Sequence, residues 1–111
     1  MQPEDQVRLQ HMLDAGQQAL RFASGRVRTD LEQDRMLLLA LVKCLEIIGE
    51  AASKVSPEVR AGAPEIPWPN LVAMRNRLIH GYFDINSDIV WKTIQEEIPQ
   101  LIPSLQKLLA E

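Results

Sequence analysis

The sequence predicts one all-α domain, a four- to five-helix up-and-down bundle spanning residues 1–111. Apolar residues recur at three- and four-residue steps along most of the chain, which is typical of helices packed on a core. No stretch alternates between apolar and polar residues as a half-buried strand does, and breaks containing proline or glycine separate the periodic segments. The chain is 46% hydrophobic and 24% charged, and its 111 residues suffice for one core rather than two domains.

The first predicted helix runs from about Glu4 to Ala23, with acidic residues in its first turn. Small and apolar residues repeat along it at alternating four- and three-residue steps, namely Leu9, Leu13, Gly16, Leu20 and Ala23. Ser24-Gly25 is expected to end this helix. One face of the helix should therefore pack against the core.

The second predicted helix begins near Thr29 or Asp30 and continues to about Val55. Apolar side chains cover most of its circumference, and a single charged strip remains, formed by Lys43, Glu46, Glu50 and Lys54. Such a helix is either the central helix of the bundle or part of a subunit interface. Gly49 and its small neighbours predict that the third helix approaches closely here, although a glycine with no special role fits the same pattern.

The third predicted helix runs from Pro69 to about His80 and follows a loop that contains several prolines. After a short turn, Asn86 or Ser87 is expected to cap a fourth helical segment. Apolar residues recur along that segment at helical spacing: Val90, Ile94, Ile98, Leu101, Leu105 and Leu108. Two prolines are expected to kink this helix or split it in two, Pro99 and Pro103.

The segment Met74–Tyr82 reads Met-Arg-Asn-Arg-Leu-Ile-His-Gly-Tyr and carries most of the functional information. Cleavage of a phosphodiester needs a group that moves protons near neutral pH and a cation that steadies charge on the phosphate oxygens. His80 has the chemistry for the first role and Arg75 for the second. Asn76 lies four residues before His80 and shares its helix face, so its amide is a candidate supporting group.

Arg75 and His80 would not share a face of a straight helix. They are five residues apart, which places them about 140° apart around the helix axis. One solution is that the helix ends near Ile79 and that Gly81 takes the left-handed conformation that closes helices. The other solution is that a second copy of the chain completes the site, and we expect both together.

Net charge and composition argue against several functional classes. The formal net charge of −3 disfavours a protein that coats nucleic acid through a broad basic surface, so any contact with nucleic acid should be local. Two distant histidines and one cysteine form no metal-binding motif, and Cys44 is expected in the core. No apolar run is long enough for a bilayer and the N-terminus has no signal-peptide features, so the expected location is the cytoplasm.

One pair of glutamates and one arginine near the motif allow alternative interpretations. Glu46 and Glu50 share a helix face, and their lysine neighbours favour ion pairing over metal binding. The alternative is that one of the two, with Glu50 as the candidate, reaches Arg75 and positions it. Arg77 is either a solvated or salt-bridging arginine, or a supporting contact to the substrate.

The motif resembles the signature of the HEPN superfamily (higher eukaryotes and prokaryotes nucleotide-binding). More narrowly, it is similar to HepT-like toxins, whose motif is arginine, four residues, histidine, one residue and tyrosine. Arg75, His80 and Tyr82 match that pattern. Flanking blocks resemble the same group in matching order, namely Glu46–Ala52, Ser56–Glu58, Pro64–Trp68 and Ile89–Trp91. The resemblance covers nearly the whole chain.

The resemblance implies a metal-independent endoribonuclease that needs no cofactor and acts as the toxin of a type VII (HepT/MNT) toxin–antitoxin system. Members dimerise through the motif helix, so that two subunits share one cleft. Carried onto this chain, Arg75 and His80 are the catalytic pair and Asn76 is a polar helper. Tyr82 matches the tyrosine that the partner nucleotidyltransferase (MNT) antitoxin modifies with AMP. The implied substrate is RNA, either tRNA or mRNA.

A second hypothesis belongs to a different class. The chain would then be a non-catalytic helical dimer that acts as an adaptor or as a nucleotide-binding partner of a nucleotidyltransferase. The intact set of Arg75, His80 and Tyr82 favours the enzyme, because an adaptor does not need these three residues. The absence of strand patterns and of paired carboxylates argues against the chain itself being a nucleotidyltransferase.

Overall fold

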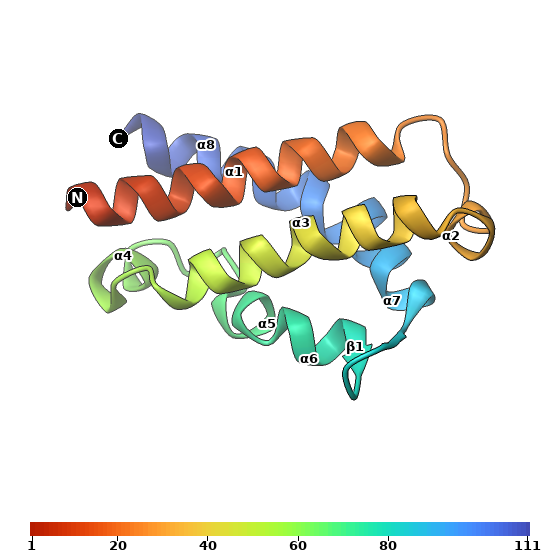
Figure 1. Cartoon of the computed structure of the whole chain (residues 1–111). Coiled ribbons are helices and arrows are strands. Elements are labelled where there is room, and N and C mark those ends of the chain that lie inside the picture. The colour runs from red at the N-terminus through yellow and green to blue at the C-terminus, as the bar shows by residue number, and fades with distance from the viewer.

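The computed structural model describes residues 1–111 and is helical apart from one two-stranded hairpin, which confirms the predicted all-α class (Figure 1). None of its helices is both long and apolar enough to cross a membrane. In chain order the elements are α1 (Pro3–Ala23), α2 (Asp30–Gln33), α3 (Arg35–Ser53), α4 (Pro57–Ala61), α5 (Trp68–Val72), α6 (Met74–Leu78), β1 (Ile79–His80), β2 (Asp84–Ile85), α7 (Ser87–Lys92), a π-helical turn (Thr93–Glu97) and α8 (Ile98–Ala110).

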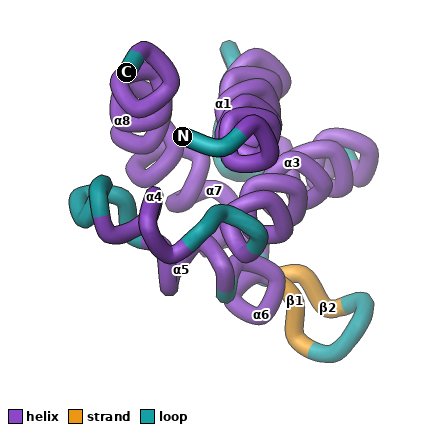
Figure 2. The backbone as a smooth tube through the Cα atoms, turned by 90° about the vertical axis from the view of Figure 1, so that its left-hand side faces the viewer, coloured by secondary structure: helices purple, strands orange, loops and turns teal.

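Helix α3 lies in the middle of the bundle. α1 runs antiparallel to α3 on one side, while α5 and α6 cover the other side (Figure 1). Figure 2 looks along the helices and shows α8 packed beside α1, with the hairpin projecting beyond α6. The core contains 29 buried hydrophobic residues, among them Leu9, Leu45, Met74 and Ile98. This central position accounts for the broad apolar circumference of α3.

The first predicted helix is confirmed as α1, and Gly25 follows it in the left-handed region with φ at 73°. The second predicted helix is wrong in one respect, because the chain breaks it at Asp34 into α2 and α3. The Asp34 carboxylate accepts hydrogen bonds from the Leu37 N–H at 3.0 Å and from Arg26 Nη2 at 2.8 Å. A side chain that caps the following helix competes with continuation of the preceding one, which explains the break.

The Asp34 cap predicts a loss of stability in acid. The hydrogen bond from Arg26, together with that from the Leu37 N–H, lowers the pKa of the Asp34 carboxyl below its ordinary value of 3.8. Because the folded-state pKa lies below the unfolded-state pKa, the ionised carboxylate stabilises the fold at pH values above the unfolded-state pKa. This contribution is lost as the pH falls through the folded-state pKa. Asp34→Asn keeps a capping oxygen but removes the charge, so it should lower the urea midpoint at pH 7 and change it little near about pH 2. Equal losses at both pH values would contradict this assignment.

The third predicted helix, Pro69 to about His80, is observed as two short helices separated at Ala73. Ala73 has φ −83° and ψ 7°, which lies outside the helical region. The second of these helices, α6, ends at Leu78, and Ile79 is extended with φ −121° and ψ 126°. The predicted helix end near Ile79 is therefore confirmed, whereas the uninterrupted helix is wrong.

His80 lies in a hairpin that the sequence did not predict. β1 pairs antiparallel with β2, with Ile79 opposite Ile85 and His80 opposite Asp84. Gly81 begins the intervening turn in the left-handed region, with φ at 76°, as expected. Strands of two residues are too short to show an apolar–polar alternation, so the sequence pattern carried no signal for them.

The C-terminal part agrees with the predicted split helix. The Asn86 side chain caps α7 by accepting a hydrogen bond from the Ile89 N–H at 3.1 Å. The π-helical turn Thr93–Glu97 separates α7 from α8 and lies directly before Pro99, whose nitrogen cannot donate a helical hydrogen bond. α8 continues through Pro103.

Helix α3 packs closely against α5 and α6 at Gly49. A Cβ atom at this position would lie 2.6 Å from the backbone oxygen of Leu71 and 3.0 Å from the Cβ of Met74. The first of these neighbours is backbone and cannot move aside without shifting α5. The predicted close packing of the motif segment on Gly49 is therefore confirmed.

Gly49→Ala should destabilise the fold by about 1–3 kcal/mol, because overpacking outweighs a gain of about 1 kcal/mol in helix propensity. Gly16→Ala is the matched control, since its added Cβ would meet Ile98 and Ile102 at an ordinary 3.5 Å. The control should be as stable as the wild type or more stable. Urea denaturation of both variants measures the difference, and equal stability of the two would refute the packing argument.

Candidate functional site

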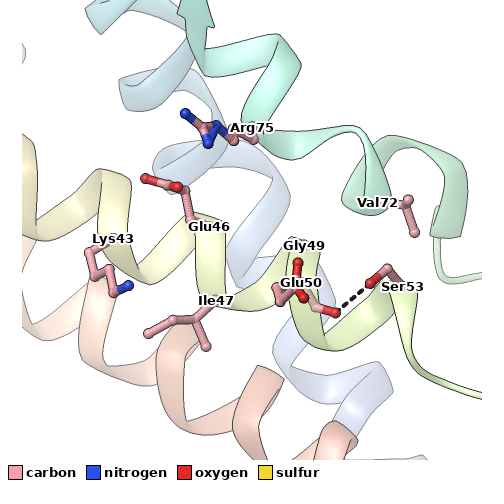
Figure 3. Close-up of a pocket in the computed structure, with 8 residues that line it drawn as sticks. All are labelled: Lys43, Glu46, Ile47, Gly49, Glu50, Ser53, Val72 and Arg75. Carbon is pink, nitrogen blue, oxygen red and sulfur yellow. Dashed lines mark hydrogen bonds between the residues drawn. The ribbon is translucent and has the colours of Figure 1, made fainter. Parts of the chain in front are cut away.

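A hollow of about 260 Å³ lies between α3 and the α5–α6 pair. Its lining is drawn in Figure 3 and consists of Lys43, Glu46, Ile47, Gly49, Glu50, Ser53, Val72 and Arg75. Arg75 extends from α6 over the charged strip of α3 (Figure 3). Because Gly49 has no side chain, α5 and α6 lie close enough to α3 to bring Arg75 to this strip.

The two glutamates of this strip have different surroundings. Glu50 forms an ion pair with Lys54, with 3.3 Å between Oε1 and Nζ, so the ion-pairing interpretation is confirmed for this pair. Figure 3 shows the Glu46 carboxylate directed toward Arg75, while Glu50 lies further along α3 beside Ser53. Of the two glutamates, Glu46 therefore faces Arg75, and Glu50, which the sequence analysis selected, does not.

His80 lies outside this hollow. Its side chain is exposed on β1, beyond the end of α6, and no hydrogen bond or ion pair joins it to Arg75. Arg75 itself forms no ion pair within 4 Å. One copy of the chain thus presents a free guanidinium near the start of the motif segment and a free imidazole near its end.

The side chains of Asn76 and Tyr82 also form no hydrogen bond within the chain. Both side chains are exposed, and Tyr82 retains 84% of its accessible surface. Tyr82 is in the turn of the hairpin, two residues after His80. Its side chain is therefore open to solvent.

Arg77 has a structural partner. Its Nη2 lies 2.6 Å from Glu97 Oε2 and its Nη1 lies 3.1 Å from Glu97 Oε1, so the two side chains form a bidentate pair. This pair connects α6 to the π-helical turn and holds the motif segment against the C-terminal part of the chain. The interpretation of Arg77 as a salt-bridging arginine is confirmed, and the guanidinium is already occupied by a carboxylate.

The profile of a family described as "Ribonuclease HepT-like" matches residues 12–108, which is most of the chain. The chain belongs to this family. It therefore falls in the HEPN superfamily, as its motif indicated.

Curated relatives support the same assignment. The HepT-like chain is 37% identical over 101 residues to "Putative RNase TTE0752" of Caldanaerobacter subterraneus subsp. tengcongensis, covering 91% of this chain and 90% of the relative. It is 40% identical over 75 residues to "Probable ribonuclease HepT" of Thermococcus cleftensis, covering 68% of each protein. No solved structure gives a significant match.

Proposed function

We propose that this HepT-like chain is a metal-independent endoribonuclease with Arg75 and His80 as its catalytic residues. The family membership carries the proposal, because relatives over most of the chain's length bear ribonuclease names. The exposed imidazole and guanidinium of the motif supply the chemistry that such a reaction needs.

The proposed reaction is an internal transesterification of RNA. A ribose 2′-oxygen loses its proton to a neutral His80 and attacks the adjacent phosphorus, forming a 2′-O–P bond. The P–O5′ bond breaks, and a protonated His80 gives its proton to the leaving 5′-oxygen. The products are a 2′,3′-cyclic phosphate and a 5′-hydroxyl. Arg75 stabilises the negative charge that builds on the non-bridging oxygens, and Asn76 orients the imidazole or binds one of these oxygens.

One base and one acid require two imidazoles, and a homodimer related by a twofold axis supplies them from two copies of His80. The separate positions of Arg75 and His80 in one chain support a shared site. Two further residues of α3, Met36 and Leu39, are exposed apolar side chains, and Met36 retains 83% of its accessible surface. They precede Lys43 by seven and four residues and so continue its helix face, which supports pairing with a second copy there.

The proposed regulation is that of a toxin paired with a nucleotidyltransferase antitoxin of the MNT type. AMP attached to the exposed Tyr82 would add bulk and negative charge two residues from His80, where an RNA phosphate must enter. Repulsion and obstruction would then prevent RNA from binding. The proposed RNA is tRNA or mRNA.

The decisive experiment is incubation of purified, unmodified protein with RNA in the presence of EDTA. The proposal predicts cleavage, with 2′,3′-cyclic phosphate at the new 3′ ends, and mass spectrometry of the protein verifies that Tyr82 carries no AMP. Inert protein under these conditions, with the dimer and fold intact, would instead favour the adaptor function.

A further inference from the structure

The turn of the hairpin carries two exposed aromatic rings next to His80. Tyr82 retains 84% and Phe83 retains 67% of their accessible surface, and their ring centroids are 5.1 Å apart with 59° between the ring planes. Neither ring is part of the buried core. The two adjacent rings therefore form an exposed apolar surface that a flat ligand can cover.

The backbone holds this turn in place. His80 and Asp84 pair across the hairpin, and the Asn86 N–H donates to the Leu78 oxygen at 2.7 Å where the hairpin leaves the bundle. Gly81 supplies the left-handed residue that the reversal needs. The two rings are therefore presented at a defined position relative to His80, and a ligand does not have to order a loose loop to use them.

We propose that Phe83 is a stacking platform for an unpaired base of the RNA substrate, next to the phosphate that is cleaved. This inference rests on the proposed function and deepens it. A nucleotide offers a flat base and an anionic phosphate side by side, and the hairpin offers a flat ring three residues from the imidazole of His80. Aromatic side chains stack on bases of any sequence, because every base has a π face.

The occupant favoured here is a base rather than a second copy of the chain. The exposed apolar residues suited to pairing lie on α3, at Met36 and Leu39, whereas the hairpin rings lie between two polar residues that pair across the hairpin, His80 and Asp84. An aromatic ring in polar surroundings is sufficient to stack on a base, whereas a subunit interface needs a continuous apolar area. Phe83 is the better platform of the two rings because it has no hydroxyl to solvate or modify.

The proposal restricts the substrate class to single-stranded segments. Bases inside an A-form stem are stacked on their neighbours and are not available to an aromatic side chain, whereas bases in loops, bulges and ends are. Cleavage and binding should therefore be confined to unpaired RNA. The platform contributes to binding of the strand and not to proton transfer, so its loss should raise KM and leave kcat nearly unchanged.

The test measures binding without cleavage. Fluorescence anisotropy of a labelled short unpaired RNA is recorded with full-length His80→Ala protein and with the same protein carrying Phe83→Leu or Phe83→Trp. Leucine keeps an apolar side chain without a ring, so Phe83→Leu should weaken binding about tenfold or more. Phe83→Trp should bind at least as tightly as its parent, and its added indole fluorescence should be quenched by the RNA. Phe22→Leu is the matched control on α1, where it should leave the affinity unchanged.

Two results of the binding measurement would overturn the proposal. The first is an unchanged affinity in Phe83→Leu, and the second is a duplex of the same sequence that binds as tightly as the single strand. Size-exclusion chromatography of each variant provides the remaining control. If Phe83→Leu turns dimers into monomers, and Phe83→Trp binds RNA more weakly than its parent, Phe83 is an interface residue and the proposal fails. The binding measurement uses His80→Ala protein and needs no cleavage. A failure of the wild-type protein to cleave RNA would therefore refute the proposed function without affecting the binding result.

Discussion

Replacing His80 by alanine should lower the rate of RNA cleavage by at least about 1,000-fold, because acid–base catalysis by one positioned group is worth 10²–10⁴. In the proposed dimer the substitution removes both the base that deprotonates the 2′-hydroxyl and the acid that protonates the leaving 5′-oxygen. The exposed position of His80 on β1 means that the fold should tolerate the change. Initial rates on a fluorogenic RNA, compared with urea midpoints, separate catalysis from stability.

The chain contains its own control for this experiment. His11 is the other histidine, and it is exposed on α1, away from the hairpin. His11→Ala should cleave RNA at the wild-type rate. Full activity of His80→Ala, or an equal loss in His11→Ala, would remove the imidazole of His80 from the mechanism.

Replacing Arg75 by alanine should lower kcat by about 10²–10³, the usual cost of removing one group that stabilises charge on oxygens in a transition state. KM should change less, because the charge on the non-bridging oxygens is greatest in the transition state. Arg75→Lys keeps the charge but loses the planar array of donors, so it should recover only part of the lost rate. Steady-state kinetics on the same RNA measures all three proteins, and a change confined to KM would instead make Arg75 a binding residue.

The carboxylate that orients Arg75 can be identified in the same assay. Glu46 is directed toward Arg75, whereas Glu50 is paired with Lys54 (Figure 3). Glu46→Gln should therefore reduce kcat several-fold, and Glu50→Gln, the matched change one helical turn away, should leave it close to wild type. The opposite ranking would restore the sequence-based assignment to Glu50.

Much of the fold follows from local patterns. Apolar residues at helical spacing identify α1 and α3. The small side chains at and around Gly49 predicted that another helix packs closely there, as it does. The break at Asp34 was missed because no proline or glycine marks it in the sequence. Only the contact of Asp34 with Arg26, eight residues earlier, together with its cap on Leu37, shows why the helix stops.

Less of the candidate site could be predicted from the sequence. The motif identifies Arg75, His80 and Tyr82, but the choice between Glu46 and Glu50 depends on where α6 crosses α3, and both residues lie on the same helix face. The bidentate contact of Arg77 spans twenty residues to Glu97, and no local pattern encodes such a distance.

The most direct test of the shared catalytic site is RNA cleavage by dimers that contain one wild-type subunit and one His80→Ala subunit. Such dimers can be prepared by co-expression with two different affinity tags and sequential purification. If both imidazoles act on one scissile phosphate, the mixed dimer should be nearly as inactive as the doubly substituted protein. Half of the wild-type activity in the mixed dimer would show that each subunit works alone, and would contradict the account.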